Sequence, residues 1–192
     1  VGQNPARQAA IHAGVPIEKP AYIVNQVCGS GLRSIAAGYQ SIMSSDSNVV
    51  IAGGQESMSN APHAISIRDD QKLEESNLVD TMIKDGLWDA FNGYHMGITA
   101  ENIANKWKIT RQDQDDFALL SQTKAEQAQK DGKFKSEIVP VILKSKNSDT
   151  KFEVDEYPRS GMTMEKLTKL SPSFKKNGTV TAGNASGIND GA

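Results

Sequence analysis

A strand–turn–helix–strand pattern in the first 54 residues constrains the fold more than any other feature of the sequence. Residues 22–27 form a compact run with strand character, bounded by Pro20 and Gly29. Apolar side chains recur at helical spacing in residues 30–43, and residues 48–52 form a second apolar run that ends at two glycines. A strand, a crossover helix and a second strand make a βαβ unit with parallel strands. The pattern therefore predicts an α/β fold.

The rest of the chain contains further helix signals and one strand signal. The expected elements are a short helix over residues 4–13 that ends at Gly14, a helix capped by Thr99 that runs to about residue 108, a long helix over residues 110–130 capped by Thr110, a strand over residues 138–143 with Pro140 marking an edge, and a short helix over residues 163–170. Residues 55–97 show no sustained period. We therefore expect an α/β core segment, a long inserted segment and a return to the core.

Charge and hydropathy exclude some partners. Lys and Arg number 21 against 23 Asp and Glu, which gives a formal net charge of -2. This balance provides no general attraction to nucleic acid or to an acidic membrane surface. Mean hydropathy is -0.47, and no apolar run approaches the ~20 residues that a membrane helix needs. We expect neither nucleic acid nor a membrane as a partner.

The chain contains a single cysteine, Cys28. A disulfide and a cysteine metal site within the chain are therefore excluded, and a reducing compartment is the default. Cys28 lies where the first predicted strand turns into a helix, and Gly29 and Gly31 permit a sharp turn there. The N-terminus of a helix favours the thiolate, which is the nucleophilic form. These observations alone leave a nucleophile and an inert turn cysteine equally open.

Four stretches together carry a family resemblance. They are residues 25–33 (NQVCGSGLR), residues 52–59 (AGGQESMS), residues 85–101, which contain GYHMGITAE, and residues 177–192 (NGTVTAGNASGINDGA). In this order they resemble the nucleophile region, the substrate-binding loop domain and the return to the core of thiolases. The His95–Met96 pair is similar to that of the acetoacetyl-CoA, or biosynthetic, branch.

The resemblance implies a fold and a domain organisation. Thiolases are layered αβαβα sandwiches of two similar halves, with a loop domain inserted in the first half. By this resemblance, residues 1–56 are part of the N-terminal core with the nucleophile turn, residues 57–188 are the inserted loop domain that binds CoA, and residues 189–192 return to the core. Members are usually homodimers or homotetramers.

The resemblance also implies roles for individual residues. Cys28 would accept the acetyl group as a thioester. The predicted binding residues for CoA and the acyl group are Leu87, His95, Met96, Arg159, Phe174, Ala182, Ala185, Ser186 and Gly187. Arg159 would contact the nucleotide, and the small residues near the end would let the pantetheine amides approach the main chain. His12 and His63 have no comparable context, and we treat both as structural. No metal and no cofactor are implied, because the CoA thioester is the substrate.

The resemblance is incomplete, because thiolases also use a His in a Gly-His-Pro context, a second Cys in a Cys-x-Gly-Gly-Gly context and an Asn-Glu-Ala-Phe stretch. None of these occurs in the chain. We therefore expect a fragment of an acetyl-CoA acetyltransferase that by itself lacks the acid–base machinery. The alternatives are a longer-chain 3-ketoacyl-CoA thiolase, a ketoacyl synthase and a CoA-binding module without turnover. The expected substrates are acetyl-CoA and acetoacetyl-CoA, in the cytoplasm or else in mitochondria.

Overall fold

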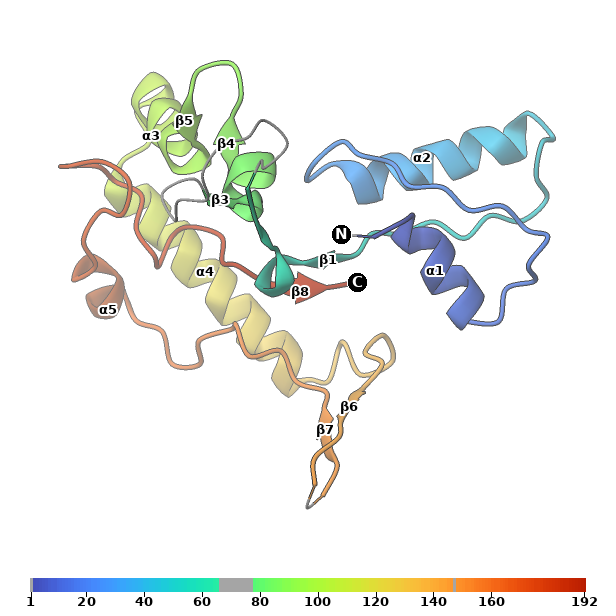
Figure 1. Ribbon diagram of the computed structural model, residues 1–192. Coiled ribbons are helices and arrows are strands. Elements are labelled where there is room, and N and C mark those ends of the chain that lie inside the picture. Colours follow the sequence, from blue (N-terminus) through green and yellow to red (C-terminus); the bar gives the residue numbers. More distant parts are fainter. Residues whose placement is uncertain (1, 66–77, 147) are drawn as a thin grey trace. The chain divides into compact units, whose positions relative to one another are not determined.

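The computed structural model describes residues 2–65, 78–146 and 148–192, and these form two compact units (Figure 1). The first unit comprises Val1–Trp88 and Ile188–Ala192, as far as they are described, and the second comprises Asp89–Gly187. The domain boundaries expected at residues 56 and 188 stay a prediction.

Two helices of the first unit match the sequence prediction. Helix α1 (Pro5–His12) is capped by Asn4, whose side chain accepts a hydrogen bond from the Arg7 N–H at 3.0 Å. The chain leaves this helix through Gly14, whose φ of +83° suits a residue without a Cβ. Helix α2 (Ser30–Met43) covers the predicted range.

Helix α2 packs on the extended segment that follows it, but no parallel ladder forms. A Cβ on the buried Gly38 would lie 3.0 Å from the Val50 side chain, so the helix approaches residues 48–52 closely. The predicted strands over residues 22–27 and 48–52 are nevertheless wrong as strands, since neither has a ladder partner among the described residues. The only pairing recorded there is an isolated bridge between Gln26 and Cys28. An extended run becomes a strand only when a neighbour takes up its main-chain hydrogen bonds.

Short elements make up most of the rest of the first unit, in keeping with the absence of a sustained period. They are β1 (Glu56–Ser57), the 3₁₀ turn η1 (Met58–Asn60), β2 (His63–Ala64), β3 (Val79–Asp80), the π-helix η3 (Met82–Leu87) and β8 (Asp190–Gly191). Strand β4 (Trp88–Asp89) spans the boundary between the units. Strands β1 and β8 pair antiparallel, as do β2 and β3. Residues 66–77, part of the segment that was expected to be irregular, lie outside the described residues.

The second unit is built on two long helices (Figure 1). Its elements are β5 (Tyr94–His95), which pairs with β4, α3 (Met96–Trp107), α4 (Arg111–Lys130), the antiparallel pair β6 (Val141–Leu143) and β7 (Thr150–Phe152), and the short helix α5 (Met164–Thr168). Helix α4 begins with a capping box in which Thr110 and Asp113 bond to each other's main-chain N–H. Helix α5 packs against α4. Its N-cap is Thr163, where the predicted helix over residues 163–170 begins.

Two boundaries in the second unit differ from the prediction. Helix α3 is capped by His95 and not by Thr99, whose hydroxyl is buried without a hydrogen-bond partner among the described residues. The helix begins earlier because the imidazole supplies the acceptor that its first turn needs. Strand β6 begins at Val141 and not at residue 138, because Pro140 has no N–H to donate to a ladder.

The buried core that the structure describes lies in the second unit. Its fully or nearly buried apolar side chains are Ala104, Leu167 and Val180, and its buried polar side chains are Glu101, Asp115 and Thr181. By contrast, Leu32, Val49 and Ile51 of the first unit are 75%, 84% and 86% exposed. The second unit is therefore the better-packed body, and its core is unusually rich in polar groups.

Candidate active site

Cys28 stands on a sharp, strained turn directly before helix α2. Val27 has a φ of +48°, which is rare for a β-branched residue and places strain next to the sulfur. The Ser30 hydroxyl secures the turn by accepting from the Gln26 N–H at 2.8 Å and donating to the Val27 carbonyl at 2.6 Å. The Gly29 N–H donates to the Gln26 carbonyl at 3.0 Å. The turn leaves Cys28 exposed as a free thiol.

The start of helix α2 has no side-chain acceptor, although the Ser30 N–H donates to the Val27 carbonyl at 3.1 Å. Gly29 at the N-cap has no side chain, and the first turn carries no acidic residue. The first-turn N–H groups of a helix have no partner within the helix and carry partial positive charge. A negative group next to Gly29 is therefore favoured, and Cys28 is the adjacent residue.

Two predicted binding residues lie against each other at the start of helix α3. The His95 and Phe174 rings stack with centroids 5.0 Å apart and an interplanar angle of 19°. Gly97 makes room for this stack, since a Cβ there would lie 2.2 Å from the Phe174 ring. The Gly97 N–H donates to His95 Nδ1 at 3.0 Å. Met96, between His95 and Gly97 in sequence, is 37% exposed.

A buried carboxylate of helix α3 holds the chain where it leaves Phe174. Glu101 is 6% exposed. Its two oxygens accept from the Thr179 N–H at 2.8 and 3.1 Å, and one accepts from the Val180 N–H at 2.8 Å. Gly178 fits beside this carboxylate only because it lacks a side chain, since its Cβ would lie 2.3 Å from Oε1. Charge-assisted bonds of this kind hold the main chain firmly.

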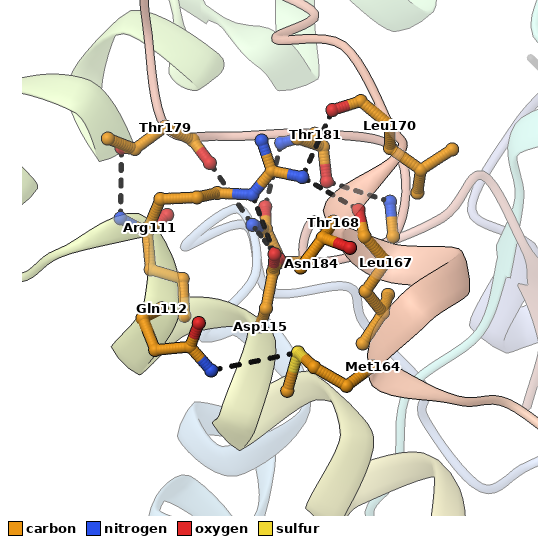
Figure 2. A network of polar contacts seen from close by, with 12 residues as sticks. Arg111, Gln112, Asp115, Met164, Leu167, Thr168, Leu170, Thr179, Thr181 and Asn184 are labelled. Atoms are coloured by element: carbon orange, nitrogen blue, oxygen red, sulfur yellow. Dashed lines mark hydrogen bonds and ion pairs between the residues drawn. The ribbon is translucent and has the colours of Figure 1, made fainter.

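A second buried carboxylate, on helix α4, holds the next turn (Figure 2). The fully buried Asp115 forms an ion pair with Arg111 at 2.7 Å and accepts from Asn184 Nδ2 at 2.9 Å. Asn184 Oδ1 in turn accepts from the Thr181 N–H at 2.7 Å. Arg111 also donates to the Leu167 carbonyl of α5 at 2.7 Å. This network joins α4, α5 and residues 179–184.

Four predicted binding residues lie on the segment that this network anchors. Ala182 and Ser186 are exposed, whereas Ala185 and Gly187 are partly buried. The Tyr157 ring lies over Gly187, where a Cβ would come within 2.1 Å of it. The segment therefore combines small side chains with firm anchoring, which suits close approach of a ligand to the main chain.

The other three predicted residues lie on other segments. Cys28 and Leu87, the last residue of η3, belong to the first unit. Arg159 is exposed: its N–H donates to the Gln122 side chain at 2.9 Å, while its guanidinium makes no recorded contact with the described residues.

Sequence reasoning missed the polar anchors Glu101, Asp115 and Asn184. The only sequence signal for these anchors is that Glu101 and Asp115 lie within predicted helices, ahead of the polar, glycine-rich residues 177–192. In the described parts of the chain, no group of three His, Cys, Asp or Glu side chains is placed to hold a metal ion. Nor does any helix described there have the length and apolar character needed to span a membrane.

Comparison with known proteins identifies the family. The family model for the thiolase N-terminal domain matches residues 1–192. Acetyl-CoA acetyltransferases of Paracoccus denitrificans and Rhizobium meliloti are 60% and 59% identical over 191 residues, covering 100% of this chain and 49% of each relative. The crystal structure of the Bacillus anthracis acetyl-CoA acetyltransferase matches with a TM-score of 0.92 and 42% identity, over 98% of this chain and 48% of that one.

The chain thus spans about half the length of the relatives it matches. The solved neighbour and the mixture of helices and strands confirm the predicted α/β class and the thiolase-like fold. On these matches, the chain belongs to the thiolase family, within which it corresponds to the N-terminal domain.

Proposed function

We propose that the protein carrying this chain is an acetyl-CoA C-acetyltransferase that uses Cys28 as its acyl-accepting nucleophile. The observation that carries the proposal is the position of Cys28, exposed on a strained turn and adjacent to the N-terminus of α2, which has no side-chain cap. The N–H groups of a helix N-terminus can donate to a negative group that develops beside them during acyl transfer. The names of the relatives support the same activity.

The proposed reaction has two acyl transfers. The Cys28 thiolate attacks the carbonyl carbon of acetyl-CoA, the bond from that carbon to the CoA sulfur breaks, and CoA leaves as a thiolate that takes up a proton. The α-carbon of a second acetyl-CoA, after losing a proton to a base, then attacks the Cys28 thioester. This step forms acetoacetyl-CoA and returns the Cys28 thiolate. Thiolysis of acetoacetyl-CoA by CoA is the reverse.

The second unit would recognise CoA. His95, Met96 and Phe174 form a mixed polar and apolar surface, and residues 182–187 present main chain with little side-chain bulk. The pantetheine amides need such hydrogen-bonding main chain, and its methylene groups need apolar contact. The free guanidinium of Arg159 would suit a CoA phosphate, and Leu87 of the first unit would supply an apolar contact.

Oligomer and location belong to the same proposal. Large exposed apolar side chains such as Val49 and Ile51 support burial in a larger assembly, which we propose to be a homodimer or homotetramer. The free cysteine is compatible with a reducing compartment, and we propose the cytoplasm. Light scattering of the full-length protein distinguishes dimer from tetramer.

The activity is tested by thiolysis of acetoacetyl-CoA with the full-length protein and its Cys28→Ala variant. We expect turnover that the variant loses by several orders of magnitude. Longer 3-ketoacyl-CoA substrates cleaved faster than acetoacetyl-CoA would assign a degradative thiolase. Malonyl thioesters consumed faster than acetyl-CoA would assign a ketoacyl synthase. CoA binding without turnover of any of these would overturn the enzyme proposal.

A further inference from the structure

We infer that His95 is held as the neutral tautomer with its proton on Nε2, so that it offers a ligand a hydrogen-bond donor and not a base. The inference begins with one bond, from the Gly97 N–H to His95 Nδ1 at 3.0 Å. A main-chain N–H can only donate, so Nδ1 must present a lone pair. A neutral imidazole with a bare Nδ1 carries its proton on Nε2.

The same bond gives this tautomer an energetic advantage. Nδ1 is the N-cap acceptor of helix α3, and the backbone of Gly97 is buried. With a proton on Nδ1, two N–H groups would face each other and the Gly97 N–H would have no acceptor. The penalty for a buried unpaired donor corresponds to a bias on the order of tenfold to a hundredfold toward the Nε2–H form.

The ring is also held against rotation. Turning the imidazole by half a turn would exchange Nδ1 for a carbon and abolish the cap. Phe174 stacks on the His95 ring at 5.0 Å, and the absence of a side chain on Gly97 lets Phe174 lie there. The helix cap therefore selects one flip state and one tautomer, and the stack fixes the plane of the ring.

The Nε2–H group is then free for a ligand. Nε2 has no recorded hydrogen-bond partner among the described residues, and it is not one of the buried unpaired atoms. Its natural partner is an uncharged oxygen acceptor such as a carbonyl. If the proposed function holds, on which this ligand assignment rests, that carbonyl belongs to the thioester or to a pantetheine amide. His95 would orient the substrate and would not remove its proton.

The tautomer is tested directly by histidine-selective ¹⁵N labelling of the full-length protein. The spectrum of His95, assigned by its loss in His95→Asn, should show a bare Nδ1 and a protonated Nε2 at neutral pH. A protonated Nδ1 would overturn the inference. This measurement requires no enzyme activity, so it stands even if the proposed function fails.

A matched pair of variants separates the cap from the donor. In His95→Asn the side-chain oxygen replaces Nδ1 and keeps the cap, but no donor reaches the Nε2 position. In His95→Gln the amide reaches that position, but the cap is lost. Both variants lose the stack on Phe174, so we expect the melting temperature of His95→Asn to stay above that of His95→Gln because only His95→Asn keeps the cap. His95→Asn should raise KM for acetyl-CoA roughly twofold to tenfold, with kcat nearly unchanged. His95→Gln should lower the melting temperature and change KM less.

The pH profile completes the test. If His95 is only a hydrogen-bond donor, the kcat/KM profile of His95→Asn against pH keeps the shape of the unsubstituted protein. If His95 is a catalytic base, the substitution removes an ionisation from that profile and lowers kcat. The second outcome would overturn the assignment of His95 as a donor.

Discussion

Adding a single methyl group at Gly97 should disrupt the contact between His95 and Phe174. In Gly97→Ala the new Cβ would lie 2.2, 2.3 and 2.4 Å from three atoms of the Phe174 ring, where ordinary contacts are 3.4–4 Å. The ring must therefore move by more than 1 Å, which breaks its stack on His95.

The size of the effect follows from two opposing contributions. Ala is a better helix former than Gly by about 1 kcal/mol, so the helix itself favours the substitution. Overpacking costs about 1–3 kcal/mol, and the lost aromatic stack about 0.5–1.5 kcal/mol more. We expect the free energy of unfolding to fall by about 0.5–3.5 kcal/mol, because the clash and the lost stack outweigh the helix propensity.

The assay is urea unfolding of the full-length protein, with Gly86→Ala as the matched control. Gly86 also lies in a helix and has no positive φ, and a Cβ added there would have no neighbouring atom within 4 Å. The control should be neutral or slightly stabilising. Adding Phe174→Ala to Gly97→Ala should remove the clash, so the two substitutions should show a coupling free energy of at least about 1 kcal/mol. A Gly97→Ala protein as stable as the Gly86→Ala control would refute this packing argument.

Three further predictions concern the polar anchors and the start of α4. Asn184→Ala leaves the buried Asp115 carboxylate without one of its hydrogen-bond donors. The substitution should lower the free energy of unfolding, measured by urea melts, by about 2–3 kcal/mol. The control is Asn189→Ala, which changes an exposed residue and should be neutral. Thr110→Ala removes the N-cap hydroxyl of α4 and should cost about 1 kcal/mol by the same measurement; no loss would contradict the capping role. The Thr110 hydroxyl and N–H both donate to Asp113 and lower the pKa of that carboxyl from 3.8. The stabilisation that the ionised Asp113 gives the folded state is therefore complete above that value and is lost as the pH falls through the lower folded pKa. Acid unfolding curves of Thr110→Ala should consequently show a weaker dependence of stability on pH in this range.

Sequence reasoning located the helices of this chain better than its strands. Thr110 caps helix α4 as predicted, because capping depends on residues within one turn of each other, whereas the predicted cap Thr99 was wrong and His95 takes that place. Strand pairing depends on a partner elsewhere in the chain, which a local pattern does not reveal. The extended runs at residues 22–27 and 48–52 show this limit, since no ladder partner lies beside them in the described residues.

The candidate site shows the same division. The family motifs brought His95 and Phe174 into the prediction, and the structure places their rings in contact. The anchors of the binding segment were missed, because their partners lie far away in sequence. Glu101 binds a main-chain N–H 78 residues away, and Asp115 binds Asn184 across 69 residues. No periodicity or short motif encodes such a pairing.

The central claim is that Cys28 carries the acetyl group. Its most direct test is the mass of the intact full-length protein after brief incubation with acetyl-CoA and acid quenching, followed by mapping of the modified peptide. The account predicts a gain of one acetyl group per chain, located on Cys28 and absent from Cys28→Ala. An acetyl group found on another residue, or retained in Cys28→Ala, would contradict it.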